Sequence, residues 1–169
     1  NIGFKELDSI RIKSFKRFEI QGFPTKKQEH WKYTDLKTII SKNFENLQIF
    51  TDKNNLKYNN NLLIKNFEHN KIILINGNFF ESNFNFEDEK KLKIKPLKEM
   101  LVNKESLDRF KNYFYDDQNA MISLNHALAK DGIVLEVEDN YFFNKPLIIY
   151  NFFDKSAENK LINSKVFIF

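Results

Sequence analysis

The feature that most constrains the fold is the segment KIILINGNFF, residues 71–80. Four consecutive aliphatic residues, Ile72 to Ile75, are followed by Asn76-Gly77 and then by a second piece from Asn78 to Phe80. Asn-Gly suits the two-residue turn of a β-hairpin, because both turn positions need positive φ angles. The segment therefore predicts a hairpin at about residues 71–80 and argues against an all-helical fold.

The N-terminal residues have helical rather than β periodicity. Apolar residues recur at near-helical spacing from Phe4 to Phe18 and predict an amphipathic helix over residues 4–21. Gly22 is suited to end this helix in a left-handed cap. Pro24 then prevents the helix from continuing, since proline lacks the backbone N–H that a helix needs.

A second helix is predicted over residues 26–41. Thr25 is a suitable N-cap, and Gln28 three residues later completes a capping box. In the structural interpretation, Trp31 and Tyr33 hold this helix onto the first one. Substitution of a buried Trp31 by alanine would then destabilise the protein by about 3–5 kcal/mol.

A third helix is predicted over residues 117–130. Asp116 or Asp117 can cap its first turn, and Gly132 lies just past its end. Small and aliphatic residues share one face of this helix and indicate close packing. The residues on that face are Ala120, Leu124, Ala127 and Leu128.

The remaining segments read as loop and strand. Residues 50–70 are rich in asparagine and predict a loop with one short apolar piece. The segment LKIKPLKEML predicts a short strand and then a helix, with Pro96 at or near its start. After Gly132 the chain predicts strands of about five residues separated by polar corners, with Pro146 at a strand start. The predicted fold class is therefore α+β.

Composition disfavours nucleic acid and membrane as partners. The net charge is +4, but only Arg11, Arg17 and Arg109 are arginines, and Lys, Asn, Ile and Phe dominate as they do under AT-rich codon usage. A phosphate-binding protein usually keeps arginines for bidentate contacts. No apolar run approaches the length of a membrane span, and the charged N-terminal residues do not resemble a signal peptide.

Few residues suggest chemistry. Cysteine is absent, which excludes disulfides and thiolate ligands in these residues. Glu29 and His30 are adjacent on a predicted helix and so point in different directions, which argues against acid–base catalysis. His126, beside Asn125, has no second metal ligand at helical spacing. Three acidic residues at positions 136, 138 and 139 fit the solvent face and end of a strand rather than a metal site.

Three blocks of the sequence resemble the SufD branch of the SufB/SufD family of iron–sulfur cluster assembly scaffold proteins. The first block, GFPTKKQEHWKYTDL, is similar to the family's N-terminal signature. The second block is KIILINGNFF, and the third is SLNHALAKDGIVLEVEDNYFFNKPLIIY. The residues that carry the first match are Gly22, Pro24, Thr25, Lys26, Lys27, Glu29, Trp31, Lys32, Tyr33 and Thr34. Those that carry the third are Leu124, Asn125, Ala127, Asp131, Gly132 and Pro146.

The resemblance implies a fold and partners. It implies a mainly helical N-terminal region, assigned to residues 1–131, that leads into a right-handed parallel β-helix beginning in residues 132–169. It also implies a non-catalytic, cytoplasmic scaffold subunit that pairs with SufB and with the ATPase SufC, mostly through parts outside this sequence. No catalytic, cofactor-binding or metal-binding residue is expected here, and the matched residues are expected to be structural. Since the chain starts at Asn1 and ends in the apolar run KVFIF, it is expected to be a fragment of a longer protein.

Two other functions remain open on the sequence alone. One is a stand-alone protein-interaction module, in which Lys26, Lys27, Lys32 and Trp31 contact an acidic partner. The other is a fragment of a β-helix enzyme active on carbohydrates, which would require paired carboxylates on successive turns of the β-helix.

Overall fold

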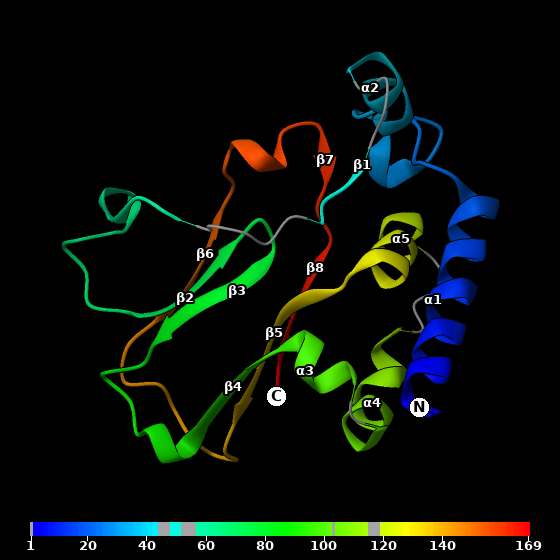
Figure 1. The fold of residues 1–169 in the computed structure, drawn as a ribbon. Helices are drawn as coiled ribbons and strands as arrows, with labels where there is room; N and C mark the ends of the chain where they lie inside the picture. The colour runs from blue at the N-terminus through cyan, green and yellow to red at the C-terminus, as the bar shows by residue number, and fades with distance from the viewer. Residues whose placement is uncertain (1, 44–47, 52–56, 103, 115–118) are drawn as a thin grey trace. The chain divides into compact units, whose positions relative to one another are not determined.

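The computed structural model describes residues 2–43, 48–51, 57–102, 104–114 and 119–169 (Figure 1). The chain forms two compact units. The first comprises Asn1–Gln48 and Met100–Ala129, and the second comprises Ile49–Glu99 and Lys130–Phe169. The first unit is built from helices and the second mainly from strands. The chain is therefore α+β, as the sequence predicts.

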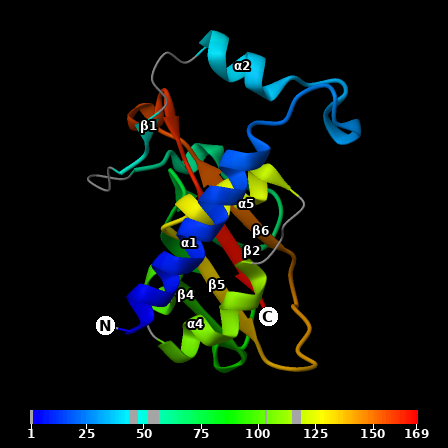
Figure 2. The ribbon, with the colours of Figure 1, turned by 90° about the vertical axis from the view of Figure 1, so that its right-hand side faces the viewer.

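The first unit is organised around two packed helices. Helix α1 spans Ile2–Gln21 and lies beside α5, which spans Ala120–Leu128 (Figures 1 and 2). Leu7 and Ile10 of α1 are buried, as are three of the four residues predicted to share the inward face of α5, Ala120, Leu124 and Ala127. The fourth, Leu128, is half-buried. The other helices are α2 (Leu36–Asn43), α3 (Leu97–Leu101, which ends in this unit), α4 (Lys104–Phe110) and two 3-10 helices at Glu29–Trp31 and Lys111–Phe114.

The first predicted helix is confirmed, and the other two need correction. No continuous helix spans residues 26–41, where the structure has a short 3-10 helix and then α2. The third helix is shorter than predicted, and its cap is Asn119, whose Oδ1 accepts a hydrogen bond from the Met121 N–H at 2.9 Å. The alternative caps, Asp116 and Asp117, lie outside the described residues.

The second unit contains three small sheets. One sheet has the order β3-β2-β6, another β4-β5-β8, and the third is formed by β1 and β7. The strands are β1 (Gln48–Ile49, which begins in the first unit), β2 (Asn70–Ile75), β3 (Asn78–Asn83), β4 (Leu92–Pro96), β5 (Asp131–Val137), β6 (Leu147–Phe152), β7 (Lys160–Leu161) and β8 (Ser164–Ile168). Short 3-10 helices occur at Asn60–Leu62, Glu89–Lys91 and Lys155–Ala157.

The predicted hairpin is confirmed. Strands β2 and β3 pair antiparallel across Asn76 and Gly77, whose φ angles are +50° and +78°. Residues 72–75 of β2 are buried on both faces, because β2 is the central strand of its sheet. The turn also docks within the unit, since the Asn76 N–H donates to the Phe152 carbonyl at 2.8 Å and its Oδ1 accepts from the Asp154 N–H at 3.1 Å.

The chain visits the three sheets in turn after α5. It passes through β5 in one sheet, β6 in the second and β7 in the third, and then β8 returns to pair with β5 in parallel. Strand β6 pairs in parallel with β2. On its other side β2 pairs with β3, and on its other side β5 pairs with β4. Both of these pairs are antiparallel. Parallel pairing is therefore confined to one side of each of these two sheets.

The core of the second unit lies between these sheets. Its buried members are Ile72, Leu74, Phe84, Leu92, Ile133 and Leu135. In the register of β8 against β5, Ile133 lies next to Val166 and Leu135 next to Ile168. Val166 is 40% exposed and Ile168 is 52% exposed. The core row of β5 thus continues onto β8, where it is only partly covered.

Charged side chains cover the β4 edge. Lys93 pairs with Glu136 in the register of β4 against β5, and the Lys91 Nζ lies 2.8 Å from an Oε of Glu138. The sequence predicts that these glutamates lie on the solvent face of a strand. Glu136 lies in β5 and is half-buried, whereas Glu138 follows the end of β5 and is exposed. Lysine on an edge strand discourages pairing with further chains.

Other fold predictions have mixed outcomes. The predicted loop at 50–70 is confirmed in its described residues, where the 3-10 helix at Asn60–Leu62 is the regular element. Pro96 ends β4 just before α3, and Pro146 precedes β6, both as predicted. The boundary between residues 1–131 and 132–169 concerns the start of a β-helix and stays a prediction. Among the described helices, none combines the length and the hydrophobicity that crossing a membrane requires.

Candidate interaction site

Residues 22–38, which contain the Trp31 signature, form a corner in the chain directly after α1. Gly22 has a φ angle of +66°, and its N–H donates to the Phe18 carbonyl at 2.7 Å, so it ends α1 as a left-handed cap. The side chain of Phe18 packs edge-on against Phe23, with ring centroids 5.0 Å apart. Buried Pro24 then turns the chain away from the helix axis.

Successive tight turns replace the predicted helix. The Gln28 N–H donates to the Thr25 carbonyl at 3.1 Å, the Trp31 N–H to the Gln28 carbonyl at 2.9 Å, and the Thr34 N–H to the Trp31 carbonyl at 2.7 Å. The Thr25 hydroxyl accepts from the Lys27 N–H at 3.4 Å, which closes a turn rather than capping a helix. The predicted capping box is therefore wrong, although both of its residues take part in backbone turns.

Asp35 makes the cap of α2. Its Oδ1 accepts from the Thr38 N–H at 3.0 Å. This backbone hydrogen bond, with the positive charges of Lys26 and Lys37, lowers the pKa of Asp35. The Lys37 N–H also donates to the Pro24 carbonyl at 3.3 Å, so the two ends of the corner are tied together.

The aromatic residues of the corner are less buried than the helix-packing interpretation requires. Tyr33 is 87% exposed, so the prediction that it holds two helices together is wrong. Trp31 is half-buried, and the 3-10 helix Glu29–Trp31 has no buried residue. The physical reason is that residues 26–34 form turns, which do not present one continuous apolar face toward α1.

A pocket of about 360 Å³ opens beside Trp31. It is lined by the corner, the end of α1 and the start of α5. Pro24 and Ala120 are its buried apolar residues, and Gln28 and His30 are exposed at its border. The complete lining is Gln21, Pro24, Gln28, His30, Trp31, Asn119 and Ala120.

The corner carries an excess of positive charge. Residues 22–38 contain four lysines, at positions 26, 27, 32 and 37, and two carboxylates. Glu29 pairs with Lys32 at 2.7 Å, and Asp35 is held at the N-terminus of α2. The Lys32 Nζ also lies 5.3 Å from the centre of the Tyr33 ring, within the range of a cation–π interaction.

The other residues of the family signature occupy structural positions. Leu124 is buried on α5, and the Asn125 carbonyl accepts from the Ala129 N–H at 2.8 Å at the end of that helix. Asp131 is buried, and its Oδ1 accepts from the Gly132 N–H at 2.9 Å. The predicted residues thus fall into separate groups rather than one catalytic cluster.

Gly132 is not the helix cap that its position after α5 suggests. It lies in β5 with a φ angle of +137°. A Cβ atom at this position would lie 1.8 Å from the carbonyl oxygen of Lys165 on β8. Both the backbone angle and the contact with β8 therefore require glycine here.

The sequence gives no indication of the role of Glu87. Its carboxylate accepts hydrogen bonds from Asn70 Nδ2 at 2.6 Å, the Tyr141 hydroxyl at 2.7 Å, and the backbone N–H groups of Asn144 at 3.0 Å and Lys145 at 3.1 Å. Burial acts to raise the pKa of Glu87, but these hydrogen bonds prevail and lower it to about 2. The site is structural, since it holds the segment before β6 against β2.

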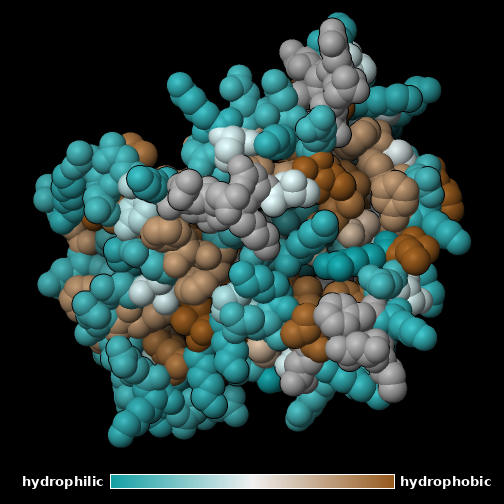
Figure 3. Space-filling view, viewed as in Figure 1, coloured by the Kyte–Doolittle hydropathy of each residue, from teal (hydrophilic) through white to brown (hydrophobic). Residues whose placement is uncertain are grey.

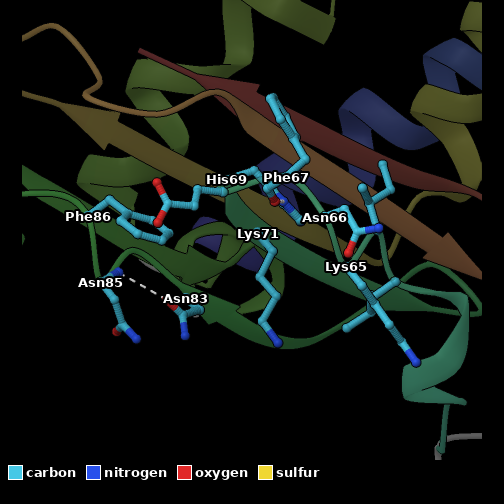
Figure 4. Close-up of a pocket in the computed structure, with 11 residues that line it drawn as sticks. Lys65, Asn66, Phe67, His69, Lys71, Asn83, Asn85 and Phe86 are labelled. Atoms are coloured by element: carbon cyan, nitrogen blue, oxygen red, sulfur yellow. Dashed lines mark hydrogen bonds between the residues drawn. The ribbon is translucent and has the colours of Figure 1, made fainter.

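A second pocket, of about 430 Å³, lies in the strand-rich unit between residues 63–71 and residues 83–86 (Figure 4). His69 organises its border, since Nδ1 lies 2.6 Å from the Phe67 carbonyl and Nε2 lies 2.8 Å from the Tyr150 hydroxyl. Lys71, labelled in Figure 4, pairs with Glu81 at 3.0 Å. These contacts fix the loop to the sheet.

The residues considered for catalysis or metal binding do not form such a site in the structure. Glu29 and His30 are both exposed on the 3-10 helix, and Glu29 is engaged by Lys32. His126 is buried on α5. In the part of the chain that the structure describes, there is no group of three or more histidine, cysteine, aspartate or glutamate residues placed to hold a metal ion.

The comparisons with known proteins identify the family. The model of the SufBD protein N-terminal region matches residues 3–149. No match to the chain was found among curated proteins. Because the matched region covers most of the chain, this protein belongs to the family of the SufBD protein N-terminal region. Membership associates it with iron–sulfur cluster assembly.

We expect substitution of Trp31 by alanine to have a smaller effect on stability than burial in a core would produce. The half-buried ring predicts a loss of about 1–2 kcal/mol in the free energy of unfolding, since only part of its surface is removed from water. Urea denaturation monitored by circular dichroism measures this loss. A loss of about 4 kcal/mol would restore the interpretation of Trp31 as a core anchor.

Proposed function

We propose that this chain is the N-terminal part of a SufD-type scaffold subunit of the iron–sulfur cluster assembly machinery. The observation that supports it most strongly is the signature around Trp31, which has the Glu-x-Trp-Lys-Tyr-Thr form of the SufD branch and folds as one corner. The family match agrees with this assignment but does not separate SufD from SufB. The choice of SufD over SufB therefore rests on the sequence signature around Trp31.

We further propose that the second unit is the beginning of a right-handed parallel β-helix. The path from β5 through β6 and β7 to β8 has the order of one turn of such a helix, in which each turn returns beside the preceding one in parallel. Val166 and Ile168 continue the core row and are partly exposed, as expected where a further turn stacks on β8. On the face of the molecule seen in Figure 3, patches of hydrophobic residues reach the surface among hydrophilic ones. The antiparallel strands β3 and β4 would close the other side.

The proposed role is structural rather than catalytic. The 169 residues contain no cysteine, and cluster ligands are usually thiolates, so ligands for a cluster would come from other parts of the assembly. The proposed partners are SufB and the ATPase SufC, the proposed location is the cytoplasm, and no cofactor, nucleic acid or membrane is assigned to these residues. A carbohydrate-active enzyme would require a pair of carboxylates, and neither of the two pockets described above is lined by such a pair.

The test is assembly of the full-length protein with defined partners. We expect it to form a stable complex on gel filtration when co-expressed with SufB and SufC of the same organism. In the matched control, SufB is replaced by a second copy of the protein's own gene, and we expect no equivalent complex. Assembly with an authentic SufD and SufC in place of SufB would instead assign the chain to the SufB branch. Failure to assemble with either set would contradict the scaffold role.

A further inference from the structure

We propose that the corner is a docking site for an extended acidic segment of a partner protein, which places an apolar side chain or a proline in the pocket beside Trp31. This inference does not depend on the choice between SufB and SufD. It assigns a binding role to the Trp31 signature, in addition to the structural role that its turns have.

The first observation is that two large aromatic residues of the corner are not used in a core. Tyr33 is almost fully exposed, and one side of Trp31 faces the pocket. The hydrogen bonds that shape residues 22–38 come from the backbone and from Thr25 and Asp35, so the turns do not need either ring. Tryptophan and tyrosine at a surface supply large contact areas and are the residues most often found as hot spots of protein interfaces.

The second observation is that backbone hydrogen bonds already hold the turns of the corner in place. The backbone bonds described above join Thr25, Gln28, Trp31 and Thr34 in series, and the Lys37 N–H returns to the Pro24 carbonyl. A partner therefore does not have to order this surface on binding. Such preorganisation raises affinity by reducing the loss of conformational entropy.

The third observation is the chemistry of the pocket. Pro24, Trp31 and Ala120 provide apolar surface for one side chain of the partner. Gln28 and His30 at the border can exchange hydrogen bonds with a peptide backbone. An extended segment satisfies both features, because its side chains alternate with exposed peptide groups.

The fourth observation is charge. Lys26 and Lys27 lie at the start of the corner with exposed side chains. The corner holds four lysines against two carboxylates, Glu29 and Asp35, of which Glu29 pairs with Lys32 and Asp35 caps α2, so a surplus of positive charge remains. Acidic residues that flank the apolar anchor would complement these lysines and accelerate association. A nucleic-acid partner fits less well, because the corner contains no arginine for bidentate phosphate contacts.

Trp31 is the only tryptophan of the 169 residues, so its fluorescence reports on this site. The probe is a synthetic peptide of alternating Glu and Asp around a central Leu-Pro pair, titrated into the full-length protein. A second peptide with lysine in place of each acidic residue tests charge, and a single-stranded oligonucleotide tests nucleic acid. Titration of Trp31→Phe identifies the part of the signal that comes from Trp31.

We expect the acidic peptide alone to cause a saturable change in Trp31 fluorescence. Tyr33→Ala, and the double variant Lys26→Glu with Lys27→Glu, should each weaken binding about tenfold or more with little change in Tm, because these side chains are exposed. Lys13→Glu, an exposed lysine in the middle of α1, is the matched charge control and should bind normally. No saturable change, equal binding of the basic peptide, binding of the oligonucleotide only, or binding unaffected by the corner variants would each overturn the inference.

Discussion

Substitution of Gly132 by alanine is expected to destabilise the protein by about 3–5 kcal/mol or to prevent folding. Two costs add at this position. The φ angle of +137° is unfavourable for any residue with a Cβ, and the new atom would lie 1.8 Å from the Lys165 carbonyl oxygen, so β8 would have to move away from β5. Thermal and urea denaturation of the purified protein measure the loss, and the yield of soluble protein reports a failure to fold.

Gly22 provides the matched control for this substitution. It also has a positive φ angle, but a Cβ built on it meets no atom within 4 Å. Gly22→Ala should therefore cost only the backbone term, about 1–2 kcal/mol. If Gly132→Ala and Gly22→Ala lowered stability equally, close contact between β5 and β8 would not be the reason for glycine at position 132.

Substitution of Glu87 by alanine is expected to lower the free energy of unfolding by about 2–3 kcal/mol at neutral pH. The change leaves the partners Asn70, Tyr141 and the N–H groups of Asn144 and Lys145 without their common acceptor. Hydrogen bonds to a charged group contribute more than neutral ones. Glu89, an exposed residue two positions further on, is the control, and Glu89→Ala should have little effect.

The same carboxylate predicts a dependence of stability on pH. Its pKa is about 2 in the folded protein, below its ordinary value of 4.5, so the folded state favours the ionised form. This contribution is complete above about pH 5 and decreases as the pH falls through 4.5 toward 2. The difference in stability between the wild type and Glu87→Gln should therefore shrink over that interval. A constant difference from pH 7 to pH 2 would contradict the assignment.

Local chemistry explains which parts of the fold could be predicted from sequence. The hairpin depends on Asn76 and Gly77, which take the positive φ angles that their residue types favour, and α1 depends on a regular apolar pattern that ends at Gly22. Both are determined within a few neighbouring residues. The sequence therefore carries nearly all the information needed to recognise them.

The error at residues 26–41 arose because the same residue types serve in turns and in helix caps. Thr25 and Gln28 fit a capping box but instead close successive turns. Asp35, which stands before the apolar residue Leu36, was a second cap signal in the sequence and is the one that α2 uses. Two cap signals ten residues apart indicate a corner followed by a short helix.

The features that could not be predicted depend on residues far apart in the chain. Glu87 resembles a surface residue in the segment NFEDEKK, and its partners at positions 70, 141, 144 and 145 become visible only when the chain has folded. The need for glycine at position 132 likewise comes from Lys165 on β8. The family resemblance marked Gly132 without giving this reason.

The parallel pairing of β2 with β6 has a consequence for how the protein is made. The β2–β3 hairpin can form within about 1–10 microseconds of its synthesis, because its strands are adjacent. The second neighbour of β2 arrives much later, since Asn70 pairs with Leu147 and Ile75 with Phe152. At a translation rate of roughly 5–20 residues per second, β2, whose residues Ile72 to Ile75 are buried in the folded protein, waits for seconds with one edge unpaired. The nascent chain is therefore most vulnerable to aggregation during that interval, and it is protected only when the ribosome has released residues 147–152.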